Sequence, residues 1–375
     1  MTEPAAKKDD WSAHIWLGCD LETWLRLVVA GRFDFGWKQL HLLPLGVLFG
    51  LGHQFLRFAQ DSLYRDRLRG VELQPPVFIL GHWRCGTTLL HELLIRDPRH
   101  TSPNTYQCFD PCHPLLTEWF AHRFLKWMLP SNRLMDNMAV GFDRPQEEEF
   151  ALALLGAPSP YATVGFPNHG PPARDTFDLD GLPAKDRERW KRTFLWFLRT
   201  LAVKDDRRFV LKSPPHTCRI PTLLELFPDA RFVYLVRNPF EVYASTMNLW
   251  KTLYRKQALH TPTYAGLEEY VFEMFVHFHR RVEATTGLIP AGRFHELRYE
   301  DLTADPAGEV RRIYDRLELG DYETARPHID RYLSETKSYQ RNKWALSDPD
   351  RQRIEERWGE VIRHYGYAAP TSGAA

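Results

Sequence analysis

The distribution of apolar residues changes character near Pro75. From there on, short apolar runs rich in β-branched and aromatic residues alternate with longer amphipathic stretches, a pattern typical of a parallel sheet covered by helices. The clearest runs are Val77–Leu80, Phe209–Leu211, Phe232–Val236 and Phe294–Tyr299. The pattern therefore predicts an α/β fold of three layers, α/β/α, with a P-loop-like parallel sheet flanked by helices.

Helix start signals stand between these runs. Pro145 precedes an acidic stretch, Pro183 precedes a long amphipathic one, and Asp305 with Pro306 precedes a third. Proline in the first turn and acidic residues beside it both suit a helix N-terminus. Two proline-rich connections, residues 97–114 and 157–181, are too long for simple turns, and we interpret them as walls or lids of a site.

The N-terminal part follows a different pattern. Apolar side chains recur at helical spacing over residues 11–69, and Gly31 ends the first run. We treat residues 1–70 as an N-terminal helical extension and residues 71–375 as the main domain.

The segment that most resembles a membrane sequence is Leu42–Leu51. Ten apolar residues are too few to cross a hydrocarbon core about 30 Å thick, which needs about 20 residues in a helix. A buried helix with Pro44 near its start is the favoured interpretation. Peripheral membrane contact through residues 37–58 is the alternative, since basic residues flank this stretch.

Composition narrows the function. The 375 residues carry 49 basic and 48 acidic side chains, so the positive excess of a nucleic-acid-binding protein is missing. The five cysteines are too few and too scattered for a disulfide framework, and the charged N-terminus lacks the apolar segment of a secretion signal. We expect a cytoplasmic protein that does not bind nucleic acid, whose oligomeric state the sequence does not predict.

The strongest local motif follows the first apolar run. The run passes into Gly81-His82-Trp83-Arg84-Cys85-Gly86-Thr87-Thr88 and then into a helical pattern, an arrangement in which backbone N–H groups and the helix dipole hold an anion. The spacing of its glycines resembles that of a nucleotide P-loop, but Thr87 stands where a Walker lysine is required. The cation is instead Arg84, inside the loop.

Two further runs end in polar side chains. Arg237 follows one of them, and Ser245 lies eight residues on, about two turns along the next helix. An arginine and a serine placed in this way can share one phosphate dianion. Another run delivers Lys212 and then His216 to the edge where parallel sheets place their ligands.

Together these motifs resemble the P-loop sulfotransferases that use 3′-phosphoadenosine 5′-phosphosulfate (PAPS), and within them a bacterial branch. The likeness covers about residues 76–345 and rests on three elements together: the loop G-x-x-R-x-G-T-T-L, the lysine at the end of an inner strand, and the arginine and serine of the strand-to-helix pair. It implies that six loop residues surround the 5′-phosphosulfate: Arg84, Cys85, Gly86, Thr87, Thr88 and Leu89. It also implies that Arg237 and Ser245 bind the 3′-phosphate and that Lys212 contacts the bridging oxygen. A looser match implies that a basic loop returns to the nucleotide through Arg341 and Lys343.

The general base stays open between several residues. Cytosolic members of the family place a histidine directly after the lysine, whereas here two prolines separate Lys212 from His216. Heparan-type members use a glutamate on the helix after the loop, and the matching position is Glu92. His216 is the first candidate, Glu92 the second, and another carboxylate such as Glu147 or Asp136 the third.

The resemblance implies an enzyme that moves a sulfuryl group from PAPS to a hydroxyl or amine of a small acceptor, without a metal. A nucleotide-dependent kinase on the same fold and a non-catalytic membrane-associated module are the alternatives. Aromatic residues in the middle of the chain favour an apolar or aromatic acceptor, although core packing explains them more simply.

Overall fold

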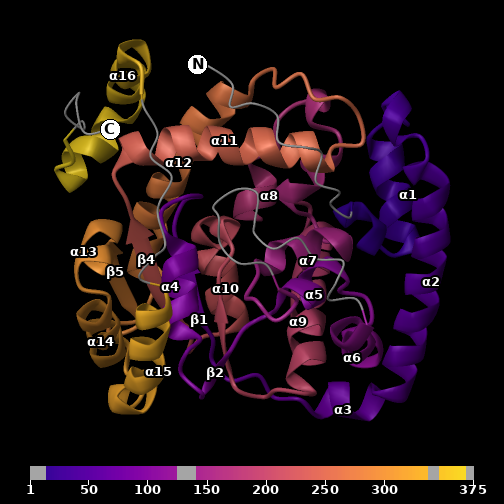
Figure 1. The fold of residues 1–375 in the computed structure, drawn as a ribbon, viewed down its shortest axis with the longest axis horizontal. Helices are drawn as coiled ribbons and strands as arrows, with labels where there is room; N and C mark the ends of the chain where they lie inside the picture. The colour runs from indigo at the N-terminus through magenta and orange to yellow at the C-terminus, as the bar shows by residue number, and fades with distance from the viewer. Residues whose placement is uncertain (1–13, 125–140, 337–345, 369–375) are drawn as a thin grey trace.

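Five parallel strands form the central sheet in the computed structural model, which describes residues 14–124, 141–336 and 346–368 (Figure 1). Their order is β2-β3-β1-β4-β5, with the bounds β1 Val77–Leu80, β2 His100–Thr101, β3 Arg208–Leu211, β4 Arg231–Val236 and β5 Phe294–Arg298. The four predicted strands are confirmed to within one residue. Because β1 lies between β3 and β4, the carboxyl ends of these three strands meet at the point where open α/β sheets bind ligands.

Helices cover both faces of the sheet, so the predicted three layers are confirmed. Phe78 and Leu80 pack on one face, and Val77 and Ile79 pack on the other, as the alternation of a strand requires. The first face is covered by α7 Glu148–Leu154, α9 Ala184–Ala202 and α10 Ile220–Leu226. The second is covered by α4 Thr87–Leu94, α13 Tyr299–Ala304, α14 Pro306–Leu317 and α15 Tyr322–Glu335.

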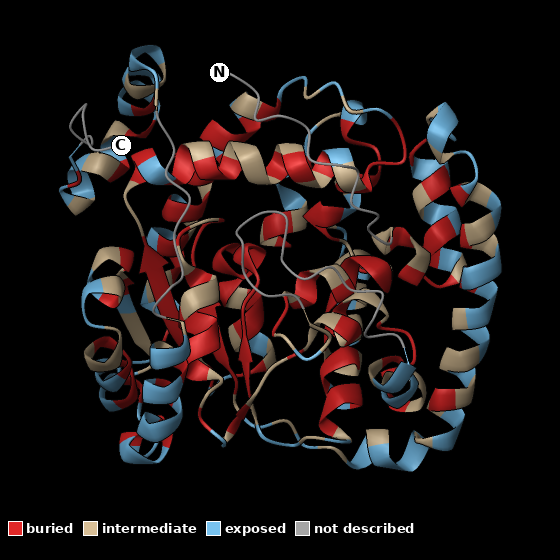
Figure 2. Cartoon of the chain, viewed as in Figure 1, coloured by how far each residue is buried: buried red, intermediate tan, exposed pale blue. Residues whose placement is uncertain are grey.

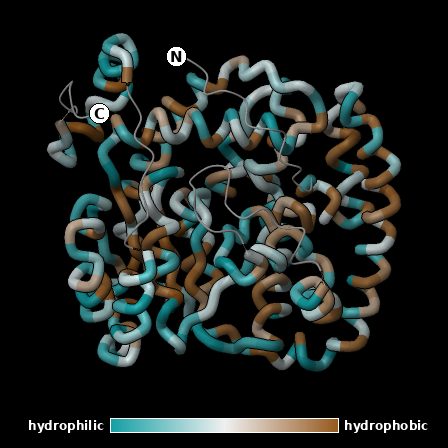
Figure 3. The backbone as a smooth tube through the Cα atoms, viewed as in Figure 1, coloured by the Kyte–Doolittle hydropathy of each residue, from teal (hydrophilic) through white to brown (hydrophobic). Residues whose placement is uncertain are grey.

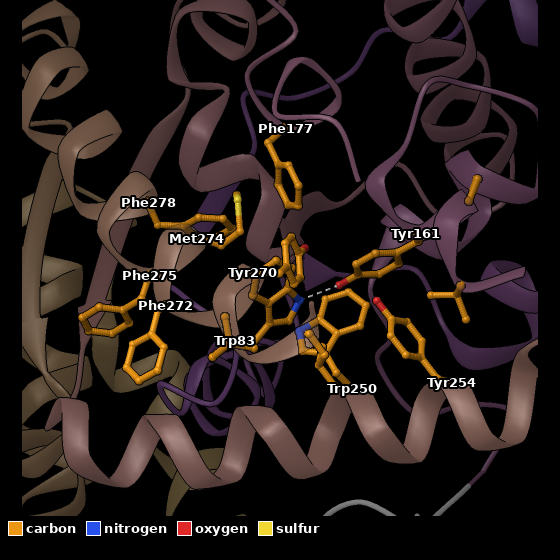
Figure 4. Packing of buried hydrophobic residues seen from close by; sticks show 14 of the residues in the cluster. Trp83, Tyr161, Phe177, Trp250, Tyr254, Tyr270, Phe272, Met274, Phe275 and Phe278 are labelled. Atoms are coloured by element: carbon orange, nitrogen blue, oxygen red, sulfur yellow. Dashed lines mark hydrogen bonds between the residues drawn. The ribbon is translucent and has the colours of Figure 1, made fainter. Parts of the chain in front are cut away.

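A third group of helices packs on the loop that follows β1. It consists of α11 Pro239–Gln257, α12 Leu267–Thr285 and α16 Asp348–Tyr365, and α11 crosses above the sheet in Figure 1. Their aromatic side chains form one cluster around Trp83, whose ring meets that of Trp250 edge to face at 5.2 Å (Figure 4). The loop after β1 therefore rests on a rigid apolar support.

Short helices fill the two proline-rich connections, which were predicted to be walls or lids. They are α5 Thr105–Phe109 in the first and η4 Pro160–Gly165, η5 Pro167–His169 and α8 Asp175–Asp178 in the second. α6 Pro114–Phe124 begins where the first connection ends. Two further 3₁₀ turns are η6 Pro214–Cys218 and η7 Thr286–Leu288. β2 was not predicted, because its two residues are too short to form a recognisable run.

The N-terminal extension is helical as predicted, with η1 Ile15–Gly18, α1 Leu21–Ala30, η2 Trp37–Gln39, α2 Leu42–Leu63 and α3 Arg65–Gly70. Asp20 caps α1 by accepting a hydrogen bond from the backbone N–H of Thr23 at 2.8 Å. Trp24 of α1 belongs to the same buried cluster as Trp83. The division at residue 70 stays a prediction, and the two parts share a core.

The prediction of a buried helix at residues 42–51 is wrong. α2 has 22 residues, and its buried positions are only Leu42, Gly46, Gly50 and Gln60. At about 1.5 Å per residue it is about 33 Å long, and it is apolar and long enough to cross a membrane by length and composition alone. It lies at the right edge of the molecule, exposed in Figure 2 and largely hydrophobic in Figure 3. The sequence estimate was too short because the apolar residues after Leu51 are spaced at helical intervals.

Candidate active site

The turn between β1 and α4 has the backbone geometry of an anion site. Arg84 and Gly86 both have positive φ, 67° and 90°, and such left-handed residues are typical of turns whose N–H groups converge on an anion. Gly86 is also the N-cap of α4, whose first N–H groups have no partner within the helix. A Cβ on Gly86 would lie 2.1 Å from Cδ2 of Tyr299, so glycine is required here.

Other loop residues serve through the backbone or through packing. Cys85 is buried, and burial raises the pKa of its thiol to about 12, so it stays protonated and is no nucleophile. Thr87 is buried, whereas Thr88 and Leu89 are half-buried on the first turn of α4. The hydroxyl of Thr217 accepts a hydrogen bond from the N–H of Gly81 at 2.8 Å and fixes the start of the loop.

The structure brings Arg237 and Ser245 to this loop. Nε of Arg84 donates to Oγ of Ser245 at 2.8 Å, and Nη1 of Arg237 donates to the carbonyl of Arg84 at 3.0 Å. β1 and β4 are neighbouring strands, which explains why residues more than 150 positions apart meet at their ends. Arg237 also stacks over the ring of Tyr299 at 4.3 Å and pairs with the half-exposed carboxylate of Glu241. Two guanidinium groups and a hydroxyl therefore converge beside the glycine turn.

Lys212 follows β3 and is buried. Its Nζ lies 2.6 Å from Oε1 of Glu147. The other oxygen of Glu147 accepts a hydrogen bond from the hydroxyl of Tyr161 at 2.7 Å. That hydroxyl in turn accepts from Nε1 of Trp83 at 3.1 Å, the bond drawn in Figure 4. Burial raises the pKa of Tyr161 well above its usual value, so the phenol stays protonated and donates to Glu147.

This chain of contacts connects the anion loop with Lys212. Trp83 belongs to the loop, Tyr161 to η4, and Glu147 is the N-cap residue of α7. The proline-rich connection 157–181 thus contributes a wall of the site through Tyr161. The network was not predicted as a unit, because its hydrogen-bonded members are 14 to 78 positions apart and no local pattern marks their meeting.

Glu92 lies on α4 and is buried. It pairs with Arg96 one turn along the helix, and Nη1 of Arg144 lies 3.8 Å from its other oxygen. Its charge is therefore already compensated by two arginines. We therefore interpret Glu92 as a structural residue and not as the general base.

The structure does not support His216 as the general base. Pro214 and Pro215 open the 3₁₀ turn η6, which directs the His216 side chain into the core. Its ring is fully buried beside Phe78 and Phe194, and Nε2 lies 2.6 Å from Oε1 of the equally buried Glu148. An acceptor hydroxyl cannot reach it in this structure.

Three predicted positions lie outside the described residues. They are Asp136, Arg341 and Lys343.

Comparison with known proteins decides the family. A family model described as the sulfotransferase family matches residues 75–323, about two thirds of the chain. This chain belongs to the sulfotransferase family. It is 41% identical over 359 residues to the Mycobacterium bovis and Mycobacterium tuberculosis enzymes named omega-hydroxy-beta-dihydromenaquinone-9 sulfotransferase Stf3, covering 96% of this chain and 92% of each relative.

Solved structures agree on the fold. Sulfotransferase STF9 from Mycobacterium avium superposes with a TM-score of 0.70 at 19% identity, over 96% of this chain and 93% of that chain. STF1 from Mycobacterium tuberculosis gives a TM-score of 0.62 at 19% identity, over 90% and 91%. The sulfotransferase described here is therefore an enzyme of a known architecture, and the kinase and non-catalytic alternatives are not supported.

Proposed function

We propose that this enzyme transfers a sulfuryl group from PAPS to the terminal hydroxyl of a long, apolar acceptor of the isoprenoid quinone class. One observation carries the choice of acceptor, namely the 41% identity, over nearly the whole chain, with enzymes named for a hydroxylated dihydromenaquinone. Trp83, Tyr161 and Trp250 are buried, so the aromatic cluster holds the loop in place and does not itself form the acceptor surface.

The arrangement of cations supports PAPS as the donor. The turn at residues 81–88 and the N-terminus of α4 suit the 5′-phosphosulfate, because N–H groups and the helix dipole attract an anion. Arg237 and Ser245 stand beside this turn, where a 3′-phosphate on the same nucleotide would lie. The half-exposed carboxylate of Glu241 that now pairs with Arg237 remains in contact with water, so a phosphate can replace it as the partner of the guanidinium.

In the proposed reaction, the acceptor oxygen attacks sulfur while the bond from sulfur to the bridging oxygen of the donor breaks. The products are a sulfate ester and adenosine 3′,5′-bisphosphate. Lys212 stabilises the charge that develops on the departing phosphate, and Glu147 takes the proton of the acceptor hydroxyl. The hydrogen bond from Tyr161 and the ion pair with Lys212 hold the two oxygens of Glu147 in place. No step requires a metal, and this remains part of the proposal.

A cytoplasmic location also belongs to the proposal. The five cysteines are free and buried, which is compatible with a reducing compartment.

The test is a transfer assay with purified enzyme and radiolabelled PAPS. We expect label to appear in a dihydromenaquinone that carries a terminal hydroxyl and not in the same quinone without it. Lys212→Ala serves as the inactive control. Transfer to small phenols but not to the hydroxylated quinone would overturn the choice of acceptor, and failure to transfer from PAPS to any acceptor would overturn the donor.

A further inference from the structure

The outward face of α2 carries no charged side chain between Leu42 and Leu63. Its most exposed apolar side chains are Leu48, Leu51, Phe55, Phe58 and Leu63, of which Phe55 and Phe58 are 70% and 71% exposed. At 100° per residue these five positions fall within one arc of the helix, which also holds Pro44, Gly52 and Ser62. An exposed helix of a soluble protein normally presents charged side chains to water. The outward face of α2 presents apolar side chains instead.

The two charged residues of α2 point the other way. Nη1 of Arg57 donates to Oδ2 of Asp20 at 2.8 Å, and its guanidinium lies over the ring of Trp196. Asp61 accepts a hydrogen bond from Nε1 of the same Trp196 at 3.1 Å. The charges of the helix are thus used for attachment to the rest of the protein.

The inward face of α2 is attached along most of its length. Gly46 and Gly50 allow close approach, since a Cβ on Gly46 would meet the ring of Trp24 at 2.1 Å and one on Gly50 would meet the backbone of Leu21 at 2.9 Å. Further along, Oε1 of Gln60 accepts a hydrogen bond from the N–H of Leu115 at 2.9 Å. A helix held in this way cannot be surrounded by lipid, so it cannot cross a bilayer without losing these contacts.

Basic residues adjoin the apolar face at its C-terminal end. α3 follows α2 directly and exposes Arg65, Arg67 and Arg69 against a single acidic residue, Asp66. At the N-terminal end, Trp37 is 83% exposed and Lys38 follows it. Apolar and aromatic side chains with flanking arginines and lysine are complementary to the surface of an anionic bilayer.

We propose that α2 is an in-plane membrane anchor: its outward face, from Leu48 to Leu63, inserts into the surface of an anionic bilayer, and the arginines of α3 bind lipid headgroups. The membrane contact follows from the side chains of α2 and α3 alone. Only its purpose rests on the proposed function: the anchor would bring the active site to an acceptor dissolved in the membrane.

The experiment is flotation of the full chain with vesicles, without donor or acceptor, so that it is independent of catalysis. We expect the enzyme to float with vesicles that contain phosphatidylglycerol and to bind at least about tenfold less to phosphatidylcholine vesicles or at high salt. Phe55→Glu and Phe58→Glu should each weaken binding by about tenfold or more, since each replaces a large apolar side chain that inserts into the bilayer by a charged one. Arg65→Glu with Arg69→Glu should weaken binding to anionic vesicles only.

Leu288→Glu is the matched control. Leu288 is 58% exposed and lies in η7, outside α2 and α3, so this variant should bind like the wild type. All variants should keep the wild-type melting temperature and the wild-type rate with a water-soluble hydroxylated acceptor, because none of them touches the active site.

Three results would overturn the proposal. Binding that Phe55→Glu and Phe58→Glu leave unchanged would remove α2 from the contact. A dimer in solution that these variants dissociate, with no flotation, would show that a second copy of the chain covers this face. Protein that stays with the membrane after extraction at alkaline pH would show a spanning helix and not an in-plane one.

Discussion

Replacement of the three candidate bases, one at a time, separates their roles. Glu147→Gln keeps the shape of the side chain and one of the two oxygens that accept hydrogen bonds from Tyr161 and Lys212, but removes its ability to take a proton. His216→Gln removes the partner of the buried Glu148, and Glu92→Gln removes the partner of Arg96.

Glu147→Gln should lower the rate of turnover, whereas His216→Gln should lower the stability of the fold. A general base contributes about 10²- to 10⁴-fold, so Glu147→Gln should lower kcat by that factor and change the affinity for adenosine 3′,5′-bisphosphate less than about threefold. His216→Gln removes the partner of a carboxylate that is fully buried, and breaking a buried pair of this kind costs about 3–5 kcal/mol of folding stability. Because the His216 ring is fully enclosed, kcat per folded molecule should stay near the wild-type value.

Two assays read out these effects. Single-turnover transfer with saturating donor gives the chemical rate, and urea unfolding gives the stability of each variant. Glu92→Gln is the intermediate control, with a loss in kcat below about tenfold, since two arginines already compensate its charge. Loss of turnover in His216→Gln at unchanged stability, or full turnover in Glu147→Gln, would refute the reasoning.

Three further predictions follow from the geometry of the loop and the core. Lys212→Ala should lower turnover at least about a hundredfold, because the lysine acts on the leaving group. Its affinity for the bisphosphate, measured by calorimetry, should stay within a few-fold of the wild-type value. Equal turnover in variant and wild type would remove Lys212 from the mechanism. Gly86→Ala forces a Cβ onto the Tyr299 ring at a positive φ, so calorimetry should show bisphosphate affinity falling at least about tenfold, and unaltered affinity would contradict the loop assignment. Burial lowers the pKa of His82 and of His279 to about 3, so both are neutral when folded; their stability contribution is complete above pH 6.5 and is lost as pH falls toward 3, by about 1.4 kcal/mol per residue and pH unit. Urea midpoints at pH 7.5 and 5.5 measure this loss, and a midpoint independent of pH would contradict it.

The local parts of the fold and site were predictable, and the parts that depend on distant contacts were not. Continuous apolar runs marked β1, β3 and β4, because strands buried on both faces have few polar positions to interrupt them. β5 lies at the edge of the sheet, and its sequence is interrupted by His295 and Glu296. The glycine turn and Arg237 were recognisable because each follows a buried strand directly. The contact between Arg84 and Ser245 depends on the strand order, which the sequence did not predict.

The errors have physical causes as well. Pro214 and Pro215 fix a 3₁₀ turn that points His216 inward, and residue spacing alone cannot give that direction. Glu147 pairs with Lys212 across 65 positions, so the acidic stretch 147–149 could be recognised as a helix start but not divided into a site residue and two core residues. In α2 the apolar residues resemble those of a core helix, and only the structure shows that they face outward.

The most direct measurement compares how the enzyme binds adenosine 3′,5′-bisphosphate and adenosine 5′-monophosphate, which differ only in the 3′-phosphate, in wild type and in Arg237→Ala. Charge-assisted hydrogen bonds to one phosphate are worth about 2–3 kcal/mol in total, so the wild type should prefer the bisphosphate by at least about thirtyfold. In Arg237→Ala this preference should fall below about fivefold, while affinity for the monophosphate stays the same. Equal affinity for both nucleotides in the wild type, or an undiminished preference in the variant, would contradict the claim that one nucleotide is held at both ends by the glycine turn and Arg237.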